Sequence, residues 1–253
     1  MFKAMLTDIN LLRDSLDVIS NFINEGTFTI TNNGLSMSAI DPANIAMVLF
    51  DLLSSAFNEY KAVGSIKITI NIPYFVSILK RAQAGDSVEL ELSDAGNSLK
   101  IKMIGDSVRT FTLPLINARD KKVEAPDKIN DGFKTKVELE AGVLREGTKD
   151  SLMVSDNVLL KCDEKSFNMI SIGDSSQVNL ELTKGSSSLI SLDCKKSVKA
   201  KYSLEYLDKM MKAGKLAQSI IMQFADDYPL RVDYKSIDKL RLSFILAPRI
   251  DTE

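Results

Sequence analysis

The sequence predicts an α+β fold in which one unit, with two helices packed on antiparallel sheet, occurs twice. The chain resembles itself at a shift of 132 residues, which is the first observation behind this prediction. The second is that both copies follow the order strand, helix, several strands, helix, several strands. With 253 residues, of which 45% are hydrophobic, the chain is long and apolar enough for two domains with buried cores.

The matches between the two copies fall in order along the chain. Leu12-Arg13-Asp14 falls on Leu144-Arg145-Glu146, and a shift longer by one residue brings Phe111-Thr112-Leu113 onto Phe244-Ile245-Leu246. Because the predicted elements repeat together with the residues, the duplication is more than a chance likeness. The other matched pairs are Ile40 with Ile172, Ser65 with Ser197, Tyr74 with Tyr206, Lys80 with Lys212, Ser87 with Ser219 and Asp94 with Asp226.

In the first copy, apolar residues at helical spacing predict a helix over residues 10–23. Asn32-Asn33-Gly34 predicts a hairpin turn between two alternating segments. Pro73 opens the second helix, where it needs no amide partner, and the helix stops near Gly85. The predicted strands cover residues 27–31, 35–40, 45–52, 88–92, 98–103 and 108–113.

In the second copy, a helix is predicted over residues 141–152 and another behind Ser203, a residue suited to an N-cap. Residues 116–130 are charged and include Pro126, which predicts an extended connector. The expected domains are therefore residues 1–115 and 131–253, joined by the connector 116–130. The predicted strands cover residues 133–139, 158–162, 167–172, 178–182, 219–224, 230–234 and 240–246.

Composition excludes several classes of function. The chain has no histidine, so a Ser-His-Asp triad and a Cys-His pair are ruled out. Its net charge of −2 gives no overall attraction for phosphate, so any contact with nucleic acid needs a local basic surface or a topological link. Cys162 and Cys194 make no CxxC pair, which favours a reduced intracellular protein. No catalytic residue, metal site or cofactor is predicted, and no apolar run approaches the roughly 18 residues of a membrane span.

Four segments resemble a known family. They are Met1-Phe2-Lys3-Ala4, residues 34–42 (GLSMSAIDP), residues 109–115 (RTFTLPL) and the terminal Leu246-Ala247-Pro248-Arg249-Ile250. Over essentially the whole chain, the layout is similar to the two-domain subunit of the DNA sliding clamps of archaea and eukaryotes, the proliferating cell nuclear antigen family.

The resemblance implies a ring of three subunits joined head to tail, with two pseudo-repeated clamp domains in each. The helices would face the hole, the sheets would form the outer wall, and the ring would hold double-stranded DNA without sequence specificity. Such a protein is no enzyme. It tethers DNA polymerase, the clamp loader replication factor C, flap endonuclease and DNA ligase, which bind through short hydrophobic peptide motifs.

Two alternatives stay open. One is a specialised subunit of a heterotrimeric clamp. The other is a carboxylate-dependent nucleic-acid enzyme with a duplicated fold, which would need clustered acidic residues to hold Mg²⁺. No such cluster can be assembled from the sequence.

Matching cations on the helices are the candidate DNA contacts. Arg13 and Arg145 are repeat-equivalent, as are Lys80 and Lys212, so they would meet phosphates at regular intervals without reading bases. A single cation on an amphipathic helix is as often simply solvated, but the duplicated positions favour a function for the set. The expected DNA-facing residues are Arg13, Lys80, Arg81, Arg145, Lys149, Lys209, Lys212 and Lys215.

The resemblance also places a partner-peptide pocket at the connector and the C-terminal tail. Some of its residues would equally suit strand cores, whereas the apolar tail residues are not needed for folding. The pocket residues are Ile40, Ile45, Val123, Pro126, Pro229, Leu246, Ala247, Pro248 and Ile250.

Two edge strands are expected to make the subunit join, over residues 108–113 and 175–182. Arg109 is expected to reach an acid such as Glu146 or Asp150 of the neighbouring subunit. The interface residues are Val108, Arg109, Thr110, Phe111, Thr112, Leu113, Ser175, Ser176, Gln177, Val178, Asn179 and Leu180.

Overall fold

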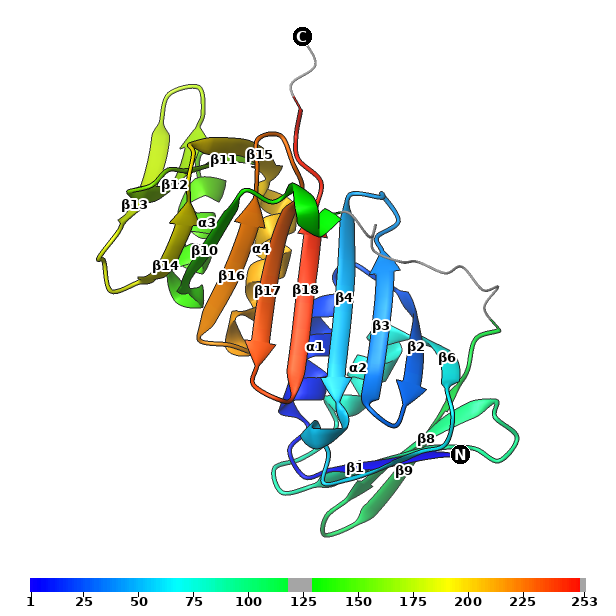
Figure 1. Cartoon of the computed structure of the whole chain (residues 1–253). Coiled ribbons are helices and arrows are strands. Elements are labelled where there is room, and N and C mark those ends of the chain that lie inside the picture. Colours follow the sequence, from blue (N-terminus) through cyan, green and yellow to red (C-terminus); the bar gives the residue numbers. More distant parts are fainter. Residues whose placement is uncertain (118–128, 251–253) are drawn as a thin grey trace. The chain divides into compact units, whose positions relative to one another are not determined.

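The computed structural model describes residues 1–117 and 129–250, and within them the chain forms four α-helices and eighteen strands (Figure 1). The chain divides into two compact units. Of the described residues, unit 1 comprises 1–42, 48–117 and 235–242, and unit 2 comprises 43–47, 129–234 and 243–250. No helix in the described part of the chain is long and apolar enough to cross a membrane.

In unit 1, two packed helices cover antiparallel sheet. The helices are α1 (Asn10–Ile19) and α2 (Ile72–Leu79). Side chains from both helices and from two sheets, including Leu12, Phe28 and Leu90, share one apolar core. One sheet has the order β5-β1-β7-β8-β9, with β5 Glu59–Ala62, β1 Phe2–Leu6, β7 Ser87–Leu92, β8 Ser98–Ile104 and β9 Val108–Pro114. The other strands are β4 (Ala46–Leu53), β3 (Gly34–Ile40), β2 (Glu25–Thr31) and β6 (Ile66–Asn71), adjacent in that order.

Unit 2 repeats this arrangement with helices α3 (Ala141–Leu152) and α4 (Leu204–Met211), which lie side by side on one face of the sheet (Figure 1). One sheet has the order β13-β12-β11-β15, with β13 Gln177–Thr183, β12 Ser166–Ile172, β11 Asn157–Cys162 and β15 Val198–Ser203. The other strands run in the order β14 (Leu189–Cys194), β10 (Thr135–Glu140), β16 (Ser219–Phe224) and β17 (Leu230–Ser236), followed by β18 (Leu240–Leu246).

The duplication is visible in the positions of the elements. The first residues of β3 and β12, of β6 and β15, of α2 and α4, and of β7 and β16 are each 132 positions apart. The hairpin registers repeat as well, because Phe28 lies opposite Met37 in unit 1 and Leu160 opposite Met169 in unit 2. The same core pattern therefore builds both units.

Both helices of unit 1 end earlier than periodicity predicts. α1 ends at Ile19 because the side chains of Ser20 and Asn21 bind the carbonyls of Asp17 and Val18, which competes with helix continuation. α2 begins behind Asn71, whose side chain accepts a bond from the Tyr74 N–H at 2.8 Å, and it ends at Leu79. In unit 2, Ser203 occupies the N-cap position of α4, but its side chain makes no capping bond.

Candidate nucleic-acid interface and partner surface

The expected cations of unit 1 lie beside acidic residues on its helices. The Arg13 Nε donates to Asp14 at 2.8 Å, and the Lys80 Nζ reaches Asp17 at 2.7 Å. The second pair joins the end of α2 to α1, since Lys80 is the C-cap residue of α2. Arg81, the next residue, is exposed. The helix face of unit 1 therefore carries cations and carboxylates together.

Unit 2 shows the same arrangement on α3 and α4. Glu146 accepts bonds at 3.1 Å from both Lys149 and Arg145, which lower the pKa of this exposed carboxyl. Lys209 lies 2.7 Å from Glu205, whose pKa it lowers, and its ammonium lies 5.0 Å from the centre of the Tyr206 ring. Lys212 and Lys215 follow α4 and are exposed.

These helix faces suit weak, non-specific contact with a phosphate backbone. At least one nearby carboxylate balances Arg13, Lys80, Arg145 and Lys209, so the local field is only slightly positive. Tight binding by counterion release would require many uncompensated cations. Such a surface can position a duplex without holding it at one place.

The predicted edge strands are edges in the structure. β9 ends the sheet β5-β1-β7-β8-β9, and β13 ends the sheet β13-β12-β11-β15. Most residues of both strands are exposed or half-buried, with Leu113 buried at the end of β9. Each strand therefore presents one side of its backbone without a strand partner in the described chain.

Arg109 forms an ion pair within its own unit. Its guanidinium binds Asp86, a carboxylate that is only 7% exposed, and donates to the Arg81 carbonyl at 3.0 Å. The expected ion pair with Glu146 or Asp150 of another subunit stays a prediction. A contact within the same unit satisfies this cation.

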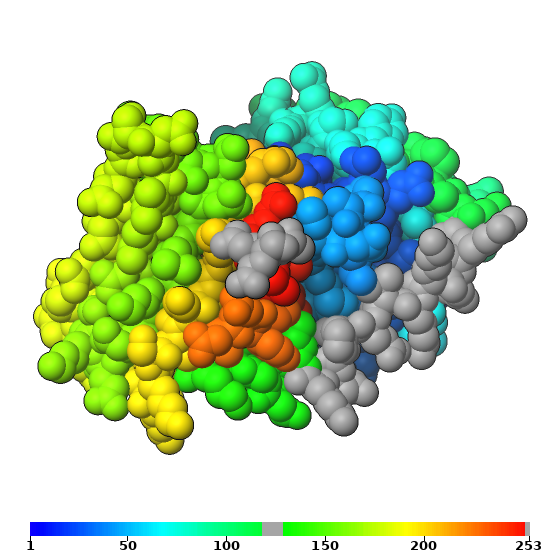
Figure 2. Space-filling view, turned by 90° about the horizontal axis from the view of Figure 1, so that it is seen from above, coloured from blue at the N-terminus to red at the C-terminus, as the bar shows by residue number. Residues whose placement is uncertain are grey.

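The C-terminal tail of unit 2 is tied down by its backbone. The Ala247 N–H donates to the Ile45 carbonyl at 2.9 Å, and the Arg249 N–H donates to the Lys201 carbonyl at 2.7 Å. The tail lies at the surface, coloured red in Figure 2.

The structure thus brings Ile45 and the tail together. Leu246 is fully buried and belongs to the core, whereas Pro248 and Pro229 are half-buried and Ile250 is 68% exposed. Ile40, in unit 1, is 43% exposed. Val123 and Pro126 lie outside the described residues.

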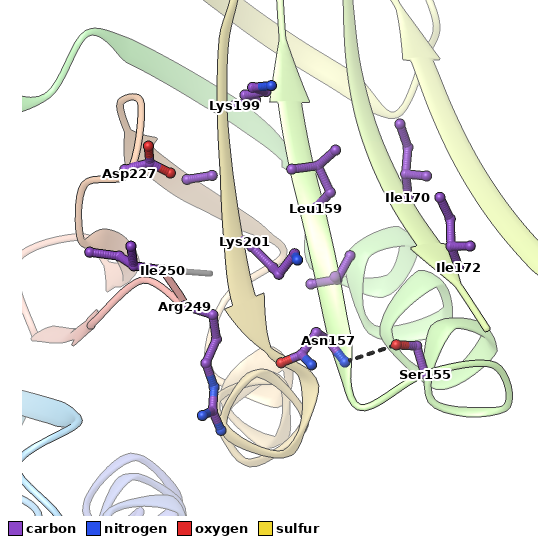
Figure 3. Close-up of a pocket in the computed structure, with 12 residues that line it drawn as sticks. Ser155, Asn157, Leu159, Ile170, Ile172, Lys199, Lys201, Asp227, Arg249 and Ile250 are labelled. Atoms are coloured by element: carbon purple, nitrogen blue, oxygen red, sulfur yellow. Dashed lines mark hydrogen bonds between the residues drawn. The ribbon is translucent and has the colours of Figure 1, made fainter. Parts of the chain in front are cut away.

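Sequence reasoning missed a hollow of about 820 Å³ beside the tail. We call it the tail hollow, and Figure 3 shows the residues that line it. Its wall includes Asn157, Leu159, Ile170, Ile172, Lys201 and Ile250. The available signal was the alternation along β11 and β12, which places these aliphatic side chains on the face opposite the core.

Comparison with known proteins identifies the family. Residues 1–118 match the family model of the proliferating cell nuclear antigen N-terminal domain, and residues 128–249 match that of its C-terminal domain. The chain belongs to the proliferating cell nuclear antigen family of DNA sliding clamps. The expected resemblance, the α+β fold with two clamp domains and the sliding-clamp function are thereby confirmed.

Archaeal relatives and a solved structure agree over nearly the full length. The chain is 34% identical over 250 residues to DNA polymerase sliding clamp 1 of Thermococcus kodakarensis, covering 99% of each chain. It is 33% identical over 236 residues to the DNA polymerase sliding clamp of Pyrococcus horikoshii, covering 93% of each. The crystal structure of a Thermococcus kodakaraensis proliferating cell nuclear antigen superposes with a TM-score of 0.90 at 26% identity, covering 98% of this chain and 100% of that one.

Proposed function

We propose that three copies of this sliding-clamp chain join head to tail into a closed ring that encircles duplex DNA. The observation that carries the proposal is the pair of free edges, β9 and β13. Their repeat equivalents are β18 and β4, which are hydrogen-bonded neighbours in one sheet. A β9 edge of one copy and a β13 edge of the next can therefore pair as β18 and β4 do.

Ring closure follows from the type of contact. Two different edges of one chain make a heterologous join, and such joins close into a ring when the rotation per subunit fits. Three two-domain chains would supply six copies of the repeated unit. Cations occur at equivalent positions of the two repeats, Arg13 with Arg145 and Lys80 with Lys212. This repetition supports the proposal that the helices face the DNA at regular intervals.

The ring would act as a non-catalytic tether. The curated relatives are named DNA polymerase sliding clamps, which supports DNA polymerase as a partner. The resemblance adds the clamp loader, flap endonuclease and DNA ligase as partners, each of which would bind at the tail through a short hydrophobic motif of its own. Archaeal relatives favour a place on the chromosome in the cytoplasm.

Retention on DNA tests the ring. The chain is loaded by an ATP-dependent clamp loader onto a nicked circular plasmid, which is then washed with salt or cut once. We expect retention on the circle through a salt wash that removes electrostatic binders, because the link is topological. Cutting the circle should release the protein by sliding. Equal loss from circular and linear DNA would contradict encirclement.

Truncation after Leu246 tests the partner surface. It removes the two backbone bonds that hold the tail and the apolar residues Pro248 and Ile250. We expect the oligomer mass to stay the same, while affinity for a fluorescent peptide with a glutamine, aliphatic and aromatic motif falls roughly ten- to a hundredfold. Normal peptide binding by the truncated chain would place the pocket elsewhere.

Light-scattering mass separates a homotrimer from the alternative of a heterotrimer subunit. A pure chain that reaches three times its own mass at micromolar concentration is self-sufficient. A chain that stays monomeric alone, and reaches that mass only with related subunits, would establish the alternative. Among residues 1–117 and 129–250, no group of three or more acidic or cysteine side chains is placed to hold a metal ion. An assay for metal-dependent nuclease activity tests the enzyme alternative.

A further inference from the structure

The tail hollow has an aliphatic floor on the outer face of a sheet. Lys201, Leu159 and Ile170 are cross-strand neighbours on β15, β11 and β12, and Figure 3 shows their side chains in one row. At the mouth, Ile172 and Ile250 are each 68% exposed. Four aliphatic side chains and that of Lys201 thus line one surface, in which apolar groups are left in water beside cations.

The charges around this floor are mainly positive. Lys199, Lys201 and Arg249 line the hollow together with a single carboxylate, Asp227. An occupant with carboxylates beside its apolar side chains would match this rim.

The Asn157 amide forms part of the wall. Its Oδ1 is buried and accepts no hydrogen bond from the described residues, whereas the Asn157 N–H donates to the Ser155 hydroxyl at 3.2 Å.

Nucleic acid fits this hollow poorly. Its lining contains no aromatic side chain on which a base could stack, and its centre is aliphatic. A charged rim around an apolar centre is instead the usual anatomy of a protein–protein contact.

We propose that the tail hollow binds a second segment of a partner polypeptide, one that alternates aliphatic and acidic residues and flanks the motif held at the tail. This inference rests on the proposed function, because Arg249 and Ile250 belong both to the tail and to the hollow. Partners that share the same short motif would then differ in their affinity for the clamp, because their flanking residues differ.

Synthetic peptides of three kinds test the proposal by fluorescence anisotropy. The first carries only the motif with a glutamine, aliphatic and aromatic anchors. The second adds eight residues of alternating leucine and glutamate, at either end in turn, and the third replaces those glutamates with lysines. We expect the leucine–glutamate flank, at one end, to tighten binding about tenfold, as one or two buried aliphatic anchors typically do. The lysine flank should add little.

The variant Ile170→Ser/Ile172→Ser should abolish the gain from the flank and leave binding of the motif-only peptide unchanged. Ile190→Ser is the matched control, since Ile190 is 53% exposed in the same unit but does not line the hollow. The inference is overturned if the flank adds nothing, if its gain survives in the double variant, or if the lysine flank gains as much. A change of oligomer mass in the double variant would assign the patch to the subunit join instead.

A second measurement separates this inference from the proposed function. The leucine–glutamate peptide alone is titrated while isoleucine methyl signals are followed by NMR. Shifts centred on Ile170, Ile172 and Ile250 support the hollow even if the motif peptide fails to bind. A peptide that moves none of these signals refutes it even if the motif peptide binds well.

Discussion

Glu89 is a buried carboxylate that two lysines hold in place. It is 7% exposed, and it binds Lys102 at 2.8 Å and Lys3 at 2.9 Å on the neighbouring strands. The hydrogen bond from Lys102, followed by that from Lys3, lowers the pKa of Glu89 below its ordinary value of 4.5. Because the pKa is lower in the folded state, the ionised carboxylate stabilises the fold above about pH 4.5, and this stabilisation is lost as the pH falls through the folded-state pKa.

Glu89→Gln should therefore destabilise the chain by about 1–2 kcal/mol at pH 7, and the difference from wild type should shrink towards pH 3. Urea unfolding at one protein concentration checks this, because association contributes to apparent stability. Glu164→Gln, at an exposed turn residue, is the control and should change little. A Glu89→Gln chain as stable as wild type at pH 7 would refute the role of this pair.

Position 34 requires glycine because the backbone of a neighbouring strand passes too close for a Cβ atom. The φ of Gly34 is +137°, and an added Cβ would lie 2.2 Å from the Leu52 carbonyl oxygen and 2.8 Å from the Leu53 Cα. These backbone atoms belong to the adjacent strand β4 and cannot move aside without disturbing the sheet. Gly34→Ala should cost about 2–4 kcal/mol, measured as a lower melting temperature. Gly64→Ala is the matched control, because its φ is +74° but nothing lies within 4 Å, so about 1 kcal/mol is expected. Equal losses in the two variants would contradict this explanation.

Residue types at the candidate site were predictable, but their partners were not. Helical spacing placed Lys80 on an exposed face, yet its acid, Asp17, lies 63 positions earlier and meets it only when α1 packs on α2. In the same way, Arg109 binds Asp86 only once unit 1 has folded, because the two residues lie in different parts of the sequence. The aliphatic floor of the tail hollow escaped notice because outward Ile170 and Leu159 look like core residues until the facing side of each strand is known.

At the scale of the elements, substitution of the cations on the helices tests directly whether the helices face the DNA. The ion pairs of Arg13, Lys80 and Arg145 are exposed or half-exposed, and such pairs contribute only about 0.2–1 kcal/mol each. Changing Arg13, Lys80, Arg145 and Lys212 together to alanine should therefore leave the oligomer mass intact. It also leaves Asp14, Asp17 and Glu146 without these cations, so the helix face becomes more negative and clamp-dependent processive synthesis should fall severalfold at low salt.

The control for this variant removes equal charge elsewhere. Lys61, Lys100, Lys136 and Lys165 are exposed and lie outside the helices, so changing them to alanine should leave processivity near wild type. If the helix variant and the control support synthesis equally, the helices do not face the DNA.

Most of the strands were also predictable as elements, because alternation survives in the sequence wherever one face is buried. Five strands were given no residue range from the sequence: β1, β5, β6, β14 and β15. β5 and β14 carry few buried residues, so their sequences alternate weakly. Their place is set by pairing with β1 and β10, which depends on residues far away in the chain.

For the whole molecule, the free edges β9 and β13 determine whether the chain assembles. Val108 on β9 is 65% exposed, and Asn179 on β13 is exposed. A lysine at an edge opposes strand pairing because its ammonium must lose water in the join. If Val108→Lys weakens each join tenfold, a closed ring with three identical joins is weakened about a thousandfold. We therefore expect Val108→Lys, and separately Asn179→Lys, to be monomeric by light scattering at micromolar concentration. Val63→Lys is the control, because Val63 is 62% exposed between β5 and β6 and should leave the trimer mass unchanged.

A mixture of the two edge variants distinguishes a head-to-tail join from a symmetric one. The Val108→Lys chain keeps an intact β13, and the Asn179→Lys chain keeps an intact β9, so one sound join can form between them. The remaining edges of that pair are both blocked, so assembly stops at two chains and no ring closes. We expect equimolar mixing of the two monomers to produce a species of twice the chain mass. Joins between like edges would instead let each variant dimerise alone through its intact edge, and mixing would add nothing. Dimers in the separate samples would thus refute the head-to-tail ring, since a heterologous join requires one edge of each kind.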